Sequence, residues 1–141
     1  MNSSIESIIA YHCAPTLRNM KVSNLVSISR DMDADMQRVL RDYNEIYNQN
    51  DLYFYELCRC KVRKLLLVFR WSKLTIYVHN PLVIRFLQAY GYREDMNLWD
   101  MLEHLRQRIE ESDEFHHEIG VFLGYPLADV QQFIQKRGNH Y

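Results

Sequence analysis

Cysteine and histidine are the residues of this chain best suited to chemistry. Cys58 and Cys60 form a Cys-x-Cys pair, Cys13 follows His12, and His117 lies in a His-His pair. Residues two apart in a strand face the same way, so the two thiols of the pair could share one ligand. Thiolates and imidazoles are the usual protein ligands of zinc. The pattern therefore raises a metal site or a thiol redox site with these five residues as candidates.

The spacing of the same residues argues against that interpretation. The chain has no second cysteine pair at zinc-ribbon or zinc-finger spacing, and adjacent histidines on a helix point about 100° apart. Cys13 as a nucleophile would need a base, and His12, its immediate helical neighbour, is badly placed to serve. A Gly-rich phosphate loop, a carboxylate pair and a nucleophile elbow are all missing. We therefore expect buried structural cysteines, no catalytic residue and no cofactor, with the metal ligands left unknown.

Basic residues concentrate in one stretch of the chain. They are Arg59, Lys61, Arg63, Lys64, Arg70 and Lys73. A basic turn could bind an anionic ligand, RNA or an acidic partner. Charge on a strand also protects a sheet edge against pairing with another sheet, and we favour that interpretation.

The stretch "EIGVFLGYPLADVQQFI", residues 118–134, has the spacing of a helix-turn-helix. Gly120 would let the second helix approach, and Gly124 would make the turn with a positive φ. Any tight helical corner needs the same features. Asp129 and the acidic run that includes Glu118 would repel phosphate, and we expect Val121 or Phe122 on the surface. The stretch favours a structural corner over a DNA-reading element.

Periodicity predicts the elements that must position these residues. Apolar residues recur at helical spacing in most segments, and two strand-like runs flank the basic connector "KVR". The predicted helices cover residues 5–12, 31–48, 81–90, 98–112, 113–123 and 127–137, and Ser4, Asn80 and Asn97 are predicted to cap the first, third and fourth of them. Residues 71–80 could form a strand or a short helix, and we favour the helix. The predicted hairpin joins 52–60 to 64–71, and 21–30 is ambiguous. The second strand is apolar on both faces, so we expect cover on each. The fold class is α+β, mostly helical, with a small antiparallel hairpin or sheet.

Size and composition point to one small domain. The chain has 141 residues, 48% of them hydrophobic, and a net charge of −1. Near-neutral charge counts against a free-standing nucleic-acid binder. The chain has no run of about 18 apolar residues and no secretory signal, so we expect no membrane association. An odd cysteine count does not fit a disulfide framework, and we expect a single domain, residues 1–141, in the cytoplasm.

Several motifs together resemble a known family. They are "YHCAPTL" followed by Lys21, "LCRC" leading into "LLLVFR", "GY" at 91–92, and "LRQRI…FHHEIGVFLGYPLADVQQFI". These motifs and their order resemble those of a bacterial family common in anaerobic Firmicutes, domain of unknown function 3793. The chain departs from it in having His116 where proline is usual, and in ending before a further aromatic, lysine-containing segment. The resemblance implies no activity, cofactor or catalytic residue.

These observations lead to a binding module without covalent chemistry, whose partner is an unknown small anionic ligand or a protein. A helix-turn-helix regulator and a Cys/His metal or redox protein remain alternatives. The "HCAPT" turn, the hairpin and the "HEIGVFLGYP" corner supply the candidates. We predict Arg59 and Lys21 as anion-binding groups and Thr16 and His117 as hydrogen-bond donors. The full predicted ligand-binding set is His12, Thr16, Lys21, Arg59, Arg70, His117, Glu118 and Tyr125.

Overall fold

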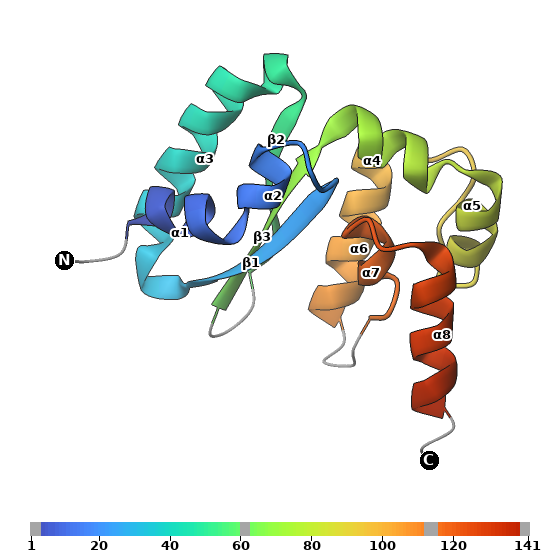
Figure 1. Ribbon diagram of the computed structural model, residues 1–141. Helices are drawn as coiled ribbons and strands as arrows, with labels where there is room; N and C mark the ends of the chain where they lie inside the picture. Colours follow the sequence, from blue (N-terminus) through green and yellow to red (C-terminus); the bar gives the residue numbers. More distant parts are fainter. Residues whose placement is uncertain (1–3, 60–62, 112–115, 139–141) are drawn as a thin grey trace. The chain divides into compact units, whose positions relative to one another are not determined.

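The computed structural model describes residues 4–59, 63–111 and 116–138, apart from the side chains of residues 58, 59, 137 and 138. Contacts divide the chain into two compact units, Met1–Lys73 (unit 1) and Leu74–Tyr141 (unit 2). The sheet belongs to unit 1, and the described part of unit 2 is helical (Figure 1). The α+β class, mostly helical with a small antiparallel sheet, is confirmed, while a single domain over residues 1–141 stays a prediction.

Unit 1 alternates helices and strands. Its elements are α1 (Ile5–His12), α2 (Ala14–Leu17), β1 (Ser23–Ser29), the 3-10 turn η1 (Arg30–Met32), α3 (Asp33–Tyr47), the 3-10 turn η2 (Asn48–Asn50), β2 (Leu52–Arg59) and β3 (Arg63–Arg70), after which α4 (Trp71–Val78) leads into unit 2. Ser4 caps α1 by accepting a hydrogen bond from the Ser7 N–H. Pro15 lies in the first turn of α2, where its missing N–H costs little.

The sheet has the order β1-β3-β2, and both pairings are antiparallel. The predicted hairpin is β2–β3, with a register shift between Glu56 and Cys58. The ambiguous segment 21–30 supplies the third strand, β1, which pairs Leu25 with Leu67. The doubly apolar pattern of the second run is explained, because β3 is the central strand and is buried on both faces.

The core of unit 1 lies between one face of the sheet and the helices α1 and α3. The strands contribute Val26, Ile28, Leu52, Phe54, Leu66 and Val68 to this core. The helices α1 and α3 and the residue after α1 contribute Ile5, Ile9, Met36, Val39, Leu40 and Cys13. The helical residues recur at three- and four-residue steps, so each helix turns one apolar side to the sheet. This packing places α3 over strand β2, and α1 beside α3 and strand β1.

Asn44 ties α3 to β2 by copying the hydrogen bonds of a strand. Its side-chain amide donates to the Phe54 carbonyl oxygen at 2.9 Å and its side-chain oxygen accepts from the Phe54 N–H at 2.9 Å. An edge strand exposes such main-chain groups on its open side. One side chain therefore satisfies both main-chain groups of Phe54.

Unit 2 continues α4 and adds four further helices in its described part: α5 (Pro81–Gln88), α6 (Leu98–Glu111), α7 (Ile119–Phe122) and α8 (Leu127–Gly138). Asn80 caps α5 by accepting from the Leu82 N–H. Asn97 and Asp100 cap the start of α6 reciprocally, each side chain accepting from the other residue's N–H. These caps and the helical character of residues 71–78 confirm the predictions made for this part of the chain.

The predicted helix over residues 113–123 is much shorter in the structure. Residues 117 and 118 form a turn, and the helix begins at Ile119 and ends at Phe122. Residues 112–115 lie outside the described residues. The turn follows from Glu118, whose side chain is drawn into the interior rather than along a helix surface. Within the described residues, no helix has the length and apolar character needed to cross a membrane.

Candidate functional site

A cavity of about 520 Å³ lies over the edge of the unit 1 core. We call it the aromatic cavity, and its lining residues are Glu6, Ile9, Ala10, Leu17, Tyr43, Tyr47, Asn50, Leu52, Phe54 and Arg70. They come from α1, α2, α3, η2 and both strands of the hairpin. The volume falls within the range of small-molecule sites.

Three aromatic rings form one wall of the cavity. Tyr43 meets Phe54 and Tyr47 nearly edge to face, with ring centroids 5.2 Å and 5.5 Å apart. The ring centroids of Tyr47 and Phe54 are 6.3 Å apart. Burial raises the pKa of the Tyr43 phenol, and the charge of Glu6 and then Tyr47 add to the increase. The phenol therefore stays protonated and can donate a hydrogen bond at neutral pH.

Arg70 closes one end of the cavity and is held there by main-chain carbonyls. Its guanidinium donates to Thr16 at 3.0 Å, to Leu17 at 2.7 Å and to Asn50 at 3.0 Å. The bonds join the end of α2 to η2 and fix the direction of the side chain. Carbonyl oxygens carry no net charge, so these contacts do not neutralise the cation. A guanidinium has further N–H groups beyond these three, and they can meet a ligand.

Cys13, Thr16 and Lys21, which belong to one motif, lie around α2 together with Arg70, which belongs to another. Thr16 is buried, and its hydroxyl donates to the Asn24 side-chain oxygen at 2.7 Å. Lys21 lies near enough to Cys13 for its charge to oppose the rise in the thiol's pKa. The Thr16 hydroxyl already donates its hydrogen bond within the protein, so its place in the ligand-binding set stays a prediction, as does that of Lys21.

Cys13 is a buried thiol rather than an activated one. Its side chain is fully buried, and burial raises its pKa to about 12. A thiol with such a pKa is not ionised at neutral pH and is a poor nucleophile or metal ligand. His12 beside it is exposed and meets the Tyr11 ring edge to face, with centroids 5.0 Å apart. The ligand role of His12 remains a prediction.

The other three metal candidates are Cys58, Cys60 and His117. Cys60 and the side chains of Cys58 and Arg59 lie outside the described residues, and His117 belongs to unit 2. Among the described residues, no three histidine, cysteine or acidic side chains are placed to hold one metal ion. The metal or redox interpretation and the anion-binding role of Arg59 therefore stay predictions.

Two of the basic residues in the hairpin, Lys64 and Arg63, bond to other residues of unit 1. Lys64 is buried, with its ammonium 2.6 Å from Asp33 and 3.5 Å from Glu56. Arg63 is exposed, but its guanidinium donates to the side chain and the carbonyl of Ser27 on the neighbouring strand. Protection of a sheet edge is therefore the wrong interpretation for these two residues, because β3 is the central strand of the sheet. Their contacts are internal, and they take Lys64 out of any surface patch.

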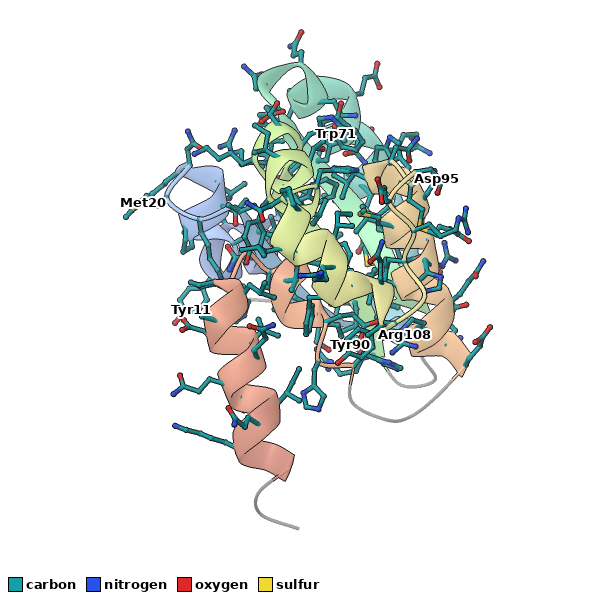
Figure 2. The ribbon with its side chains drawn as sticks, turned by 90° about the vertical axis from the view of Figure 1, so that its right-hand side faces the viewer. Tyr11, Met20, Trp71, Tyr90, Asp95 and Arg108 are labelled. Carbon is teal, nitrogen blue, oxygen red and sulfur yellow. The ribbon has the colours of Figure 1, made fainter. Side chains whose placement is uncertain are left out.

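In unit 2, Glu118 is a buried anion and not part of an acidic surface, which corrects the expectation from the sequence. Its side chain is fully buried and pairs with Arg108 through both carboxylate oxygens. Tyr92 donates to it at 3.2 Å. Arg108 also lies 5.2 Å from the centre of the Tyr90 ring, next to which it is seen in Figure 2. Both oxygens of Glu118 are thus used within unit 2.

The glycine corner between α7 and α8 has the predicted geometry. Gly124 has a φ of 84°, and a Cβ on Gly120 would lie 3.0 Å from the Val130 side chain. The expectation of an exposed Val121 or Phe122 is wrong, because both are fully buried. The short helix turns these two side chains inward.

Two predicted ligand-binding residues lie beside this corner. Tyr125 is 47% exposed, and its carbonyl accepts a hydrogen bond from the Tyr77 hydroxyl at 2.6 Å. The His117 ring lies 5.8 Å from the ring of Phe133 on α8. Their roles in binding stay predictions.

A family model described as "Protein of unknown function (DUF3793)" matches residues 9–141. The chain belongs to this family. The resemblance drawn from the sequence motifs is confirmed by this match. No curated protein and no solved structure matches the chain. The DUF3793 description names no activity, so an argument about function depends on the geometry of the chain itself.

Sequence reasoning missed most of the aromatic cavity. Of its lining residues, only Arg70 had been singled out as ligand-binding. Tyr43 and Tyr47 follow the helical period and read as core residues, yet Tyr47 is 39% exposed. The signal that could have found them is their polar hydroxyl at the end of an apolar stripe, which is typical of rings that line a cavity.

Proposed function

We propose that this protein binds a small anionic ligand in the aromatic cavity of unit 1. The observation that carries the proposal is Arg70, a cation held in place by three carbonyl oxygens at the end of a cavity with an aromatic wall. The ligand's anionic group would accept charge-assisted hydrogen bonds from the remaining guanidinium N–H groups. Its body would lie against Tyr43, Tyr47 and Phe54.

The chemistry of the lining residues supports binding without a covalent step. The described residues that line the cavity include an acid, an arginine, an amide and two phenols, and otherwise only apolar side chains. The thiol of Cys13 does not line the cavity, and it is buried beside α2 with a raised pKa. Cavities with apolar walls and a few fixed polar groups are typical of ligand sites.

The cavity can be filled without disturbing the core. Ala10 is exposed on α1 and lines the cavity, so Ala10→Leu adds bulk to the wall. Ala34 is exposed on α3 and does not line it, which makes Ala34→Leu the matched control. Both residues are helical, and alanine and leucine have similar helix propensities. The two variants should fold alike.

The test uses ligand-observed NMR with a panel of small carboxylates and phosphates that carry a ring or a short alkyl chain. We expect saturable binding of at least one compound, about millimolar for compounds of this size. That binding should be lost in Ala10→Leu and kept in Ala34→Leu. The proposal fails if no compound binds, or if Ala10→Leu binds as the unmodified protein does.

A second candidate is nucleic-acid binding by α8, favoured by its exposed Gln131, Gln132 and Gln135. Asp129, exposed in the first turn, opposes it by facing any phosphate with like charge. A gel-shift titration at several salt concentrations separates the candidates. We expect no salt-sensitive complex, and an affinity that falls steeply with salt would favour this candidate instead.

A further inference from the structure

We infer that the ligand of the aromatic cavity is a zwitterion, with a carboxylate at Arg70 and an amino group at Glu6. This inference rests on the function proposed above and adds the chemistry of the second end. It follows from the positions of the two charged residues among those that line the cavity.

The two charged residues have different neighbours among the elements that line the cavity: Glu6 lies beside α3, and Arg70 lies beside the segments that follow α1 and α3 along the chain. Glu6 is in the first turn of α1, and its carboxylate reaches Arg38 of α3 at 4.0 Å. Leu17 and Asn50, which follow these helices along the chain, both accept from Arg70. Ala10 lies between Glu6 and Leu17 along the chain, about 6 Å from Glu6 along the helix axis.

Glu6 keeps most of its capacity to bind a cation. Its side chain is 44% exposed and that of Arg38 is 51% exposed, at the limit of ion-pair distance. An exposed pair of this kind is weak, because water screens it and both side chains lose freedom to form it. Arg38 also has a second carboxylate, Asp35, at 3.9 Å. An amino group entering the cavity can therefore compete for Glu6.

The middle of the cavity suits an apolar body between the two charged groups. Ile9, Leu52 and Phe54 supply apolar surface, and Tyr47 lies one helical turn from Tyr43. Tyr43 lies close to Glu6, whose negative charge adds to the rise in the tyrosine's pKa. An ammonium at this end would meet both a carboxylate and the electron-rich face of a ring. A flat ligand with its charges at opposite ends fits this order of groups.

Three matched probes test the inference by NMR titration of the full-length protein. They are 4-(aminomethyl)benzoate, 4-methylbenzoate, which lacks the amino group, and 4-methylbenzylamine, which lacks the carboxylate. We expect the zwitterion to bind about five-fold more tightly than 4-methylbenzoate, in line with one partly exposed ion pair. The amine alone should bind most weakly, since it also faces Arg70.

Two conservative variants assign the difference to Glu6. Glu6→Gln should reduce the affinity for the zwitterion to that for 4-methylbenzoate and leave 4-methylbenzoate unaffected. Glu45→Gln is the matched control, because Glu45 is exposed on α3 and does not line the cavity, and it should change neither affinity. Equal binding of zwitterion and carboxylate, or no effect of Glu6→Gln, overturns the inference while the proposed function stands. If none of the three probes binds, the inference is contradicted, and the proposed function is contradicted as well when no compound of the carboxylate and phosphate panel binds.

Discussion

At the scale of single residues, Cys13 shows how burial decides chemistry. The thiol is fully buried, and its pKa is about 12 against an ordinary value of 9.0. We predict that iodoacetamide at pH 8 leaves Cys13 unmodified in the folded protein and modifies it once denaturant unfolds the chain. Peptide mapping by mass spectrometry reads Cys13 separately from the other two cysteines. Modification of Cys13 in the folded protein at the rate of a free cysteine would contradict this account.

The same pKa shift makes a prediction about alkaline stability. Between pH 9 and about 12 the unfolded chain loses the Cys13 proton and the folded chain keeps it. Stability therefore falls as pH rises through this window, by up to about 1.4 kcal/mol per pH unit from this group. The raised pKa of Tyr92 acts in the same direction. Urea unfolding of Cys13→Val should show a shallower decline above pH 9, and an unchanged slope would count against the shift.

The Glu118–Arg108 pair should be asymmetric in its response to mutation. Glu118 is fully buried, whereas the Arg108 side chain is 29% exposed and can reach water. Arg108→Met strands a buried anion and should cost about 3 kcal/mol, and Glu118→Gln should cost less. The control is Arg93→Met, which removes an exposed pair with Asp95 and should cost under about 0.5 kcal/mol. Equal losses in urea unfolding for Arg108→Met and Arg93→Met would be inconsistent with a buried pair.

Residue types in the sequence predicted the surroundings of Arg70 and Glu118 only in part. Thr16 was predicted from the motif around residues 12–21 and Arg70 from the separate motif "LLLVFR", and the structure places the two residues together. Their partners are carbonyl and amide oxygens, which no side-chain pattern reveals. Glu118 read as surface charge because its partner, Arg108, lies ten residues away on another helix.

At the scale of elements, the side chain of Asn44 adds a pair of hydrogen bonds to the apolar packing between α3 and β2. Asn44 takes both main-chain groups of Phe54, and its loss leaves them without that partner. We predict that Asn44→Ala costs about 2 kcal/mol and speeds hydrogen exchange at the Phe54 amide. Glu45→Ala, an exposed neighbour on the same helix, should change neither quantity. Unchanged exchange at Phe54 would show that the bridge is not formed.

The corner between α7 and α8 makes a second prediction at this scale. A Cβ on Gly120 would meet Val130 at 3.0 Å, closer than side chains normally approach. Gly120→Ala should therefore destabilise the protein by about 1–2 kcal/mol. Val130→Ala opens that space, so the double variant should lose less than the sum of the single losses. Strict additivity in urea unfolding would rule out the close contact.

Element types followed from the sequence where period and caps agreed. The caps at Ser4, Asn80 and Asn97 and the hairpin all match the structure. Segment 21–30 was ambiguous because strand β1 is recognised only by its pairing with β3, which is more than thirty residues away in sequence. The helix before Gly124 was predicted too long, because burial of Glu118 overrides local helix propensity.

At the scale of the whole molecule, the fold class and the family could be predicted from the sequence and the cavity could not. Motif order alone led to the DUF3793 family, and periodicity led to the α+β class. The aromatic cavity depends on α1, α3 and the hairpin meeting in space, and its residues span positions 6 to 70 of the chain. A local sequence pattern does not show which distant segments will contact one another. The near-neutral net charge does not indicate that Arg70 is a fixed cation in a cavity.

The central claim is that ligands enter the aromatic cavity and meet Arg70 there. Its most direct test is a heteronuclear NMR titration of isotope-labelled protein with 4-methylbenzoate, following the main-chain amides and the Arg70 side-chain Nε–H. We predict saturable shifts confined to the cavity lining, with Ala10, Tyr47, Asn50 and Arg70 among the largest. Shifts that do not saturate, or that lie outside unit 1 and leave Arg70 unchanged, would contradict the claim.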